Sequence, residues 1–252
     1  MLSQEQNWLL EEKYHGEKSE AFYADVARLE DGEPLAYLIG SIPFLNTNIY
    51  LDSRPLIPRP ETEYWTGVAI GEIKKSQHKM STHPQILDLC AGSGCIGVAI
   101  AKSIPQAKVD FIEIERRHLP TIKKNCDKNG IESSRYQIWQ SDLFTLKEAT
   151  IDKKYNFIIS NPPYIDKILN RTEQSVKDYE PSIALYGGKS GMELIEKIIE
   201  QSPRYILPKG QLWLEHEPEQ FTTINQLAEP NFSITPHKDQ YQVVRFTQLV
   251  LK

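Results

Sequence analysis

Short apolar runs alternate with amphipathic stretches from residue 84 to the end of the chain. Runs such as QILDL and YNFIIS have the length and composition of buried strands, whereas CIGVAIAKSI has those of a helix. Strands that alternate with helices are typical of right-handed βαβ units in a mainly parallel sheet. The pattern predicts strands at 85–89, 108–114, 136–143, 155–160, 210–217 and 242–250, and helices at 95–104, 119–129 and 191–206.

The first third of the chain has a different pattern. Residues 3–30 have a loose helical period and predict one or two short helices. Residues 48–52, NIYLD, alternate like one strand of a hairpin, and a helix with Thr62 near its start is expected further on. LIPRPETE, at 56–63, is expected to lack regular structure, because its two prolines fix two φ angles and remove two hydrogen-bond donors. We therefore divide the chain into an N-terminal helical segment (1–32), a connecting hairpin and PRPETE region (33–80) and a main α/β domain (81–252).

Ligands of parallel sheets bind beyond the carboxyl ends of the strands, so the residues that follow each strand are candidates for a site. The first strand is followed by a G-x-G-x-x-G pattern at 92–97, which permits a tight turn and a close approach of a ligand to backbone. Glu113 lies about twenty positions downstream, where a carboxylate can accept both ribose hydroxyl protons. Asp142 and Leu143 lie at the end of the third strand and could bind an exocyclic amine and pack against a flat base. These residues predict an adenosine-containing cofactor, without choosing between a dinucleotide and S-adenosylmethionine.

The fourth strand is followed by Asn161, Pro162, Pro163 and Tyr164. In isolation this tetrapeptide is typical of a turn that ends a strand. Its prolines lack N–H donors, but their carbonyl groups can still accept hydrogen bonds. The amide oxygen of Asn161 adds an acceptor, and Tyr164 can supply a flat wall. Two acceptors fixed side by side suit a planar –NH2 group that has two hydrogens to place.

This arrangement favours a methyl transfer. An amide or aromatic amine is a poor nucleophile, because its lone pair is delocalised into a π-system. Holding both of its N–H bonds with Asn161 and Pro162 would orient the nitrogen toward an electrophilic methyl group on a sulfonium. A nicotinamide dehydrogenase shares the glycine loop but does not explain Asn161 to Tyr164. No metal site is expected, since His216-Glu217 is followed by Gln220 where a zinc motif needs histidine.

The composition narrows the class of protein. The 252 residues are 40% hydrophobic and 25% charged, as in an ordinary soluble globular protein. The net charge of −5 opposes nucleic acid as a direct substrate, because such enzymes usually carry a basic field. No secretory signal and no apolar run of about 18 residues is evident. Three cysteines without zinc-like spacing are expected to be reduced thiols, so we expect a cytoplasmic protein without a membrane partner.

Several motifs together resemble a known family. The glycine loop, Glu113, SDLF and NPPY resemble class I S-adenosylmethionine-dependent methyltransferases that act on planar nitrogens. EPLAYLIG, LIPRPETE and YEPSIALYGGKSGMELIEKII are more specific, and with them the chain resembles the HemK/PrmC family, the protein-(glutamine-N5) methyltransferases of peptide chain release factors. The ribosomal-protein glutamine methyltransferases differ after the PR of LIPRPETE. The resemblance implies a Rossmann-like α/β fold whose mainly parallel seven-stranded sheet has a late antiparallel strand.

The resemblance also implies an activity and a set of site residues. A monomeric enzyme would transfer a methyl group from S-adenosylmethionine to the N5 amide of a glutamine in the Gly-Gly-Gln loop of a class I release factor. S-adenosylhomocysteine would be the product, no metal would take part, and the reaction would serve translation termination. The catalytic residues would be Asn161, Pro162 and Tyr164, and the substrate-binding residues Asn161, Pro162, Pro163, Tyr164, Arg59 and Glu61. The cofactor-binding residues would be Cys90, Ala91, Gly92, Ser93, Gly94, Glu113, Asp142, Leu143 and Asn161.

The chain departs from the family pattern at a few positions. Cys90-Ala91 stands where the family often has Gly-Thr, Glu113 where it usually has Asp, and Glu217 where glycine is common. None of these changes removes a reacting group. Only 32 residues precede Glu33, where the family usually has a longer helical domain that helps to bind the release factor. We therefore expect a reduced docking surface rather than altered chemistry.

Two other functions fit part of the pattern. An amino methyltransferase of nucleic acid, making N6-methyladenine or N2-methylguanine, could use NPPY equally well. It should carry a basic, aromatic-rich recognition segment, which this acidic chain lacks. A cofactor-binding subunit without activity should have damaged site residues, and those of this chain are intact.

Overall fold

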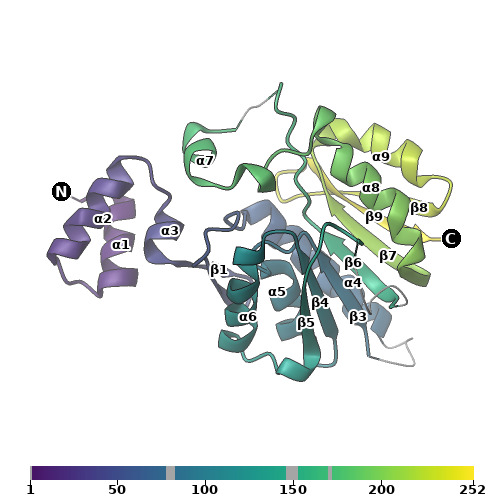
Figure 1. The fold of residues 1–252 in the computed structure, drawn as a ribbon, viewed down its shortest axis with the longest axis horizontal. Coiled ribbons are helices and arrows are strands. Elements are labelled where there is room, and N and C mark those ends of the chain that lie inside the picture. The colour runs from purple at the N-terminus through teal and green to yellow at the C-terminus, as the bar shows by residue number, and fades with distance from the viewer. Residues whose placement is uncertain (1, 78–82, 146–152, 170–171) are drawn as a thin grey trace.

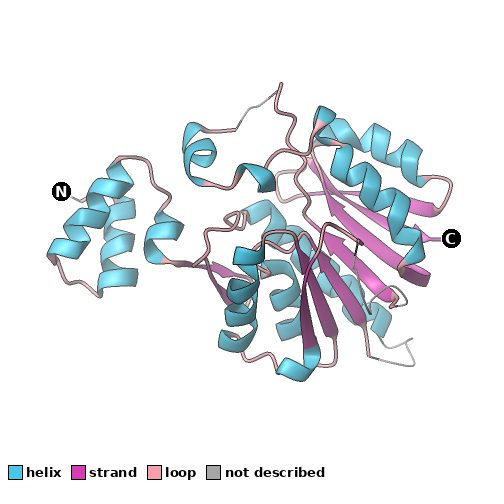
Figure 2. Ribbon diagram, viewed as in Figure 1, coloured by secondary structure: helices cyan, strands magenta, loops and turns pink. Residues whose placement is uncertain are grey.

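A twisted sheet with helices packed on both faces forms the main body of the protein, and the N-terminal helices project from one end (Figures 1 and 2). The computed structural model describes residues 2–77, 83–145, 153–169 and 172–252. The sheet has seven strands in the order β5-β4-β3-β6-β7-β9-β8. Among the described strands of this sheet, β9 pairs antiparallel with β7 and β8, and the other pairings are parallel. The strands are β3 (Gln85–Leu89), β4 (Lys108–Glu113), β5 (Tyr136–Gln140), β6 (Tyr155–Ser160), β7 (Ile206–Glu215), β8 (Phe232–Lys238) and β9 (Val244–Leu251).

The central strands are apolar on both faces because helices cover both. Along β3, Ile86 packs into one core cluster and Leu87 into the other, as expected when successive side chains point to opposite faces. The first cluster includes α4 (Pro60–Gln77), α5 (Cys95–Ser103) and α6 (Leu119–Lys128). The second includes α8 (Glu193–Gln201) and α9 (Phe221–Ala228). No helix in the described part of the chain is both long and apolar enough to cross a bilayer.

The predicted class of fold is confirmed, and three details differ from the prediction. LIPRPETE is not wholly irregular, since α4 begins at Pro60; the first helical position needs no N–H donor, which suits proline. The helix predicted at 191–206 ends at Gln201, just before Pro203, and residues from 206 onward join β7. The sequence pattern missed β8, α9 and the short α7 (Gln174–Tyr179). The predicted boundary between 33–80 and 81–252 lies in 78–82, outside the described residues.

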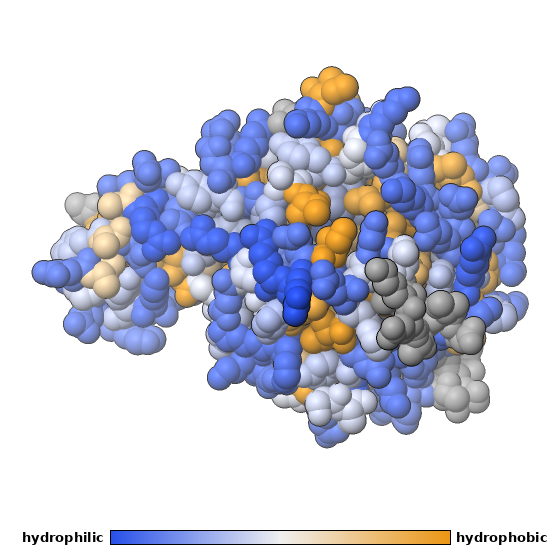
Figure 3. Space-filling view, viewed as in Figure 1, coloured by the Kyte–Doolittle hydropathy of each residue, from blue (hydrophilic) through white to orange (hydrophobic). Residues whose placement is uncertain are grey.

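The N-terminal segment has its own small core. It consists of α1 (Gln4–Tyr14), α2 (Glu20–Glu30) and α3 (Leu35–Ile39), followed by the hairpin of β1 (Ser41–Phe44) and β2 (Thr47–Tyr50). Leu9 and Phe22 are fully buried between these helices. On the face shown in Figure 3 these helices are mostly covered with hydrophilic side chains, whereas apolar side chains gather near the middle of the molecule.

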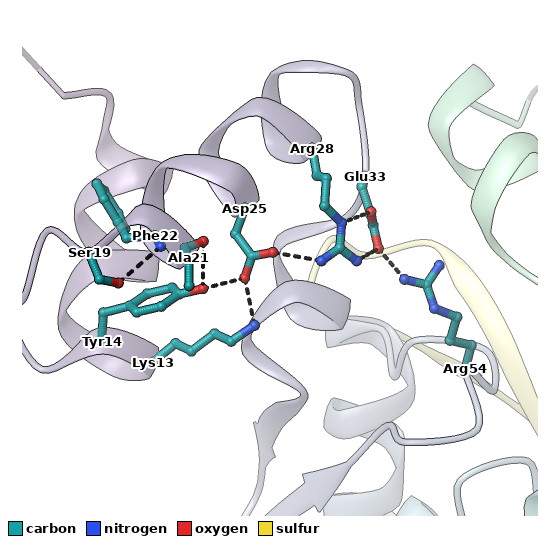
Figure 4. Close-up of polar contacts among 9 residues, drawn as sticks. All are labelled: Lys13, Tyr14, Ser19, Ala21, Phe22, Asp25, Arg28, Glu33 and Arg54. Carbon is teal, nitrogen blue, oxygen red and sulfur yellow. Dashed lines mark hydrogen bonds and ion pairs between the residues drawn. The ribbon is translucent and has the colours of Figure 1, made fainter.

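Two buried carboxylates hold the N-terminal segment together (Figure 4). Asp25 accepts hydrogen bonds from Lys13 and Tyr14 and pairs with Arg28 at 2.6 Å. Glu33 pairs with Arg28 at 2.7 Å and also with Arg54, which lies beyond β2. Because Arg54 belongs to the segment that leads to LIPRPETE, this network ties the N-terminal helices to the main body.

Two glycines in the helices of the first core cluster differ in the space around them. A Cβ atom at Gly97, in α5, would lie 2.3 Å from the ring of Phe111, whereas one at Gly71, in α4, would meet nothing within 4 Å. We predict that Gly97→Ala lowers the free energy of unfolding by about 1–3 kcal/mol through overpacking. Gly71→Ala should raise it by about 0.5–1 kcal/mol, because alanine is the better helix former. Urea denaturation followed by circular dichroism measures both, and equal stabilities would contradict the close contact of α5 with β4.

Candidate active site

A cavity of about 310 Å³ lies beyond the carboxyl ends of β3 to β6, and we call it the strand-end cavity. Gly94 is not among its lining residues; it holds the left-handed turn before α5, with a φ of 78°. The exposed side chains of Ile114 and Ile183 also line the cavity and give it an apolar rim. The other predicted cofactor-binding residues all line it: Cys90, Ala91, Gly92, Ser93, Glu113, Asp142, Leu143 and Asn161.

Two carboxylates accept hydrogen bonds from backbone N–H groups of the glycine loop and of the first turn of α5. The N–H of Gly92 donates to Oε2 of Glu113 at 2.7 Å, and the N–H of Glu115 donates to Oε1 at 2.8 Å. Each oxygen of Glu113 keeps a further lone pair, so this side chain can still accept two hydroxyl protons. The buried carboxyl of Asp88 accepts the N–H of Gly97 at 2.8 Å, and burial raises its pKa to about 8.

Cys90 has a backbone conformation that favours glycine. Its φ is 63°, in the left-handed region where side chains other than glycine are strained. The residue as a whole is partly exposed and lines the strand-end cavity, but its thiol group is buried, which raises the pKa of the thiol. The thiol therefore stays protonated and acts as a small apolar group in the wall.

Asn161 has an orientation that its hydrogen bonds determine. Its Nδ2 donates to Oγ1 of Thr62 at 3.1 Å, and Oγ1 of Thr62 donates to Oε2 of Glu215 at 2.7 Å. A threonine hydroxyl has one proton, so once that proton goes to Glu215 the hydroxyl can only accept from Asn161. The nitrogen of Asn161 therefore faces Thr62. No protein donor to its Oδ1 occurs in the described part of the chain, and the oxygen is left to accept from a ligand.

Glu215, which is 1% exposed at the end of β7, is the acceptor at the end of this chain. It also accepts the indole N–H of Trp65 at 2.5 Å and the hydroxyl of Tyr164 at 2.8 Å. Burial raises the pKa of Glu215, and its three donors act in the opposite direction. Burial and the neighbouring Glu215 raise the pKa of Tyr164 well above its usual value, so this phenol donates a proton and does not act as a base.

A second cavity of about 350 Å³, which we call the side cavity, adjoins the first. Pro162 and Tyr164 line the side cavity, Pro163 lines the strand-end cavity, and Asn161 lines both. Asn161 therefore lies where the two cavities meet. Gly187 lies close to the backbone of Pro163, because a Cβ atom at Gly187 would lie 2.4 Å from the carbonyl oxygen of Pro163. This contact requires glycine in the YGGKSG segment.

Arg59 and Glu61, which were both predicted to bind the substrate, differ in their position relative to the cavities. Arg59 lines both cavities, whereas Glu61, in the first turn of α4, lines neither. The next residue, Thr62, lines the strand-end cavity instead. Sequence reasoning noted Thr62 only as a helix start and assigned no role to Glu215, although an acid at the end of a buried strand beside β6 was a usable signal.

His118 also lines the strand-end cavity and was not predicted. Its Nδ1 lies 2.7 Å from Oγ of Ser53, which in turn lies 2.7 Å from Oγ1 of Thr121. Burial lowers the pKa of His118 to about 4, so the imidazole is neutral at physiological pH. A neutral ring adds no positive charge next to a cationic ligand.

Comparisons with known proteins agree with this geometry. Residues 73–177 match the family model of the methyltransferase small domain. A crystal structure of a methyltransferase from Pyrococcus furiosus is similar in fold, with a TM-score of 0.57 and 16% identity, covering 91% of this chain and 98% of that one. At that identity the likeness concerns the fold alone.

Relatives with curated names are closer in sequence. A protein of Rhodopirellula baltica named release factor glutamine methyltransferase is 36% identical over 216 residues, which is 85% of this chain and 72% of that protein. A protein of Thermodesulfovibrio yellowstonii with the same name is 35% identical over 200 residues, which is 78% of this chain and 68% of that protein. The chain therefore belongs to the family of release factor glutamine methyltransferases.

Proposed function

We propose that this protein transfers the methyl group of S-adenosylmethionine to the N5 amide nitrogen of a glutamine in the Gly-Gly-Gln loop of a class I release factor. The observation that carries the proposal is the orientation of Asn161, a residue that lines both cavities and whose nitrogen is held by Thr62 and Glu215, so that its oxygen is free to accept from a ligand. One cavity has the features of a nucleoside site, and the other is large enough for a side chain that reaches Asn161 from outside. The curated names of the relatives support the same activity.

The residues of the strand-end cavity fit S-adenosylmethionine. Glu113 would accept the ribose hydroxyl protons, because both of its oxygens already have backbone donors on one side and a free lone pair on the other. Asp142 and Leu143, beyond β5, would bind and pack against the adenine. When bound, the cofactor supplies a methyl group on a positively charged sulfur. The neutral His118 and the negative Glu113 and Asp142 suit that charge.

The protein's own residues would contribute to the reaction by positioning the amide group of the substrate glutamine. One N–H of the glutamine amide would donate to Oδ1 of Asn161 and the other to the carbonyl of Pro162. With both N–H bonds held, the lone pair of the nitrogen can be directed at the methyl group instead of into the amide π-system. The glutamine nitrogen gains the methyl group as the bond from that methyl to sulfur breaks, S-adenosylhomocysteine leaves, and one of the two protons on the nitrogen then passes to water. The site therefore works mainly by orientation and preorganised dipoles.

Labelling of a release factor tests the proposed substrate. The purified protein should transfer label from S-adenosylmethionine with a labelled methyl group to a class I release factor, but not to the variant whose loop glutamine is alanine. Mass spectrometry of the loop peptide should place the methyl group on the glutamine side chain. Equal labelling of the two release factors, or labelling of DNA or RNA alone, would disprove the proposal.

Replacement of Asn161 separates binding from turnover. Asn161→Ala should leave the dissociation constant of S-adenosylmethionine unchanged and lower kcat by about 10²-fold, as removal of one preorganised polar contact does in other enzymes. Calorimetry and single-turnover kinetics measure the two quantities. If cofactor affinity and turnover fall by the same factor, Asn161 contacts the cofactor rather than the glutamine.

The hydroxyl of Thr62 should matter although it does not touch the substrate amide in this scheme. Thr62→Val leaves Nδ2 of Asn161 without its acceptor and removes one donor from Glu215. We expect kcat to fall about tenfold, the equivalent of roughly 1.4 kcal/mol, from the loss of this orientation. Thr62→Ser keeps the hydroxyl and should retain most of the activity. A valine variant as active as the serine variant would show that Thr62 does not orient Asn161.

A further inference from the structure

Arg59 lies in the wall between the two cavities and is held by a buried partner. Its Nη2 donates to Oε1 of Glu180 at 2.5 Å, and the side chain of Glu180 is 1% exposed. The other oxygen of Glu180 accepts the N–H of Ile57 at 2.9 Å, so the carboxylate is fixed in turn. A guanidinium group has five N–H donors in a rigid plane, and this contact uses one of them. Arg59 is thus a fixed cation with donors to spare, one third exposed beside the cavities.

The order of the strands gives the direction of the cofactor. Glu113 is the last residue of β4, and Asp142 and Leu143 follow the next strand, β5, so the nucleoside would lie over that end of the sheet. Its amino-acid end must then extend the other way, across the glycine loop after β3 and toward β6. Asn161 follows β6, and Arg59 lines both cavities together with it. Arg59 therefore lies at the amino-acid end of the cofactor.

The carboxylate of that amino-acid end needs a donor. The N–H groups of Gly92, Gly94 and Gly97 already donate to Glu113, to the carbonyl of Ala91 and to Asp88. The acidic side chains that line the strand-end cavity, Glu113, Glu115 and Asp142, would repel a carboxylate.

Two positively charged side chains occur among the described residues of this lining, Arg59 and Lys197. Lys197 belongs to α8, whose Leu194 packs against the second core cluster; this cluster also contains Leu143, at the nucleoside end. Arg59 is therefore the cation placed to meet the carboxylate.

We propose that Arg59, oriented by Glu180, forms a carboxylate-binding subsite for the amino-acid end of S-adenosylmethionine. The proposal rests on the proposed function, since it takes that cofactor as the ligand. A guanidinium group can bind a carboxylate through two parallel N–H donors, which fixes orientation as well as position. Arg59 would thereby anchor the cofactor next to Asn161 and set where the methyl group lies.

Two ligands that differ only in the carboxylate test this subsite. Decarboxylated S-adenosylmethionine keeps the sulfonium and the ammonium group and lacks the carboxylate. In calorimetry, Arg59→Gln should weaken the binding of S-adenosylmethionine by about 10- to 100-fold, as expected for the loss of a charge-assisted contact. Binding of the decarboxylated ligand by the same variant should stay within error of the wild type, which also shows that the variant is folded. Arg59→Lys, which keeps a charge without the planar fork, should give an intermediate loss for S-adenosylmethionine alone.

Arg54 provides a matched control five residues away. It also pairs with a buried glutamate, Glu33, but it does not line the strand-end cavity. Arg54→Gln should therefore change the affinities for both ligands equally or not at all.

Two results would overturn the subsite while leaving the proposed function intact. One is an equal loss of affinity for both ligands in Arg59→Gln. The other is an unchanged affinity for S-adenosylmethionine with a raised KM for the release factor, which would place Arg59 on the protein substrate. If the wild-type protein binds neither ligand, the proposed function itself fails.

Discussion

The site depends on one buried carboxylate. Glu215 accepts hydrogen bonds from Thr62 and Trp65 on α4 and from Tyr164 beyond β6, so it joins three segments that are far apart in the sequence. Taking a carboxylate out of water costs several kcal/mol, which only good donors can offset. Removing any one donor therefore leaves part of that cost uncompensated, and the three segments are held in a single arrangement. The NPPY segment is therefore positioned through Glu215 and its donors on α4.

Buried glutamates also place the LIPRPETE segment. Arg54, before it, pairs with Glu33 of the N-terminal segment, and Arg59, within it, pairs with Glu180 beyond α7. The residue before Glu180, Tyr179, donates to the carbonyl of Asp31 at 3.2 Å. The N-terminal segment therefore contacts the segment that contains Glu180, the ion-pair partner of Arg59 in the cavity wall. It thereby contributes to the support of the site.

The sequence could predict those site residues that stand next to a recognisable strand. The glycine loop and Asn161 directly follow apolar strands and Glu113 ends one, and parallel strands bring such positions to one edge. Thr62 and Glu215 are 153 positions apart, and Ile57 and Glu180 are 123 apart, so no local pattern relates them. The strand β8 was missed because it lies at the edge of the sheet, mostly exposed, and contains Pro236, which an edge strand tolerates.

The chemistry of the site comes from the polarity of hydrogen bonds rather than from a titrating group. The two ends of the Asn161 amide have nearly the same shape, so packing alone would not decide which end faces the ligand. The choice is made by Thr62, whose single proton is drawn to Glu215, and the carboxylate can only accept. If Glu215 were a donor, Thr62 would accept from it and could donate to the oxygen of Asn161, and the nitrogen would face the ligand. A second –NH2 group facing the glutamine amide could not hold either of its N–H bonds. The acid at the end of β7 therefore makes Asn161 an acceptor, which is what a planar nitrogen nucleophile requires.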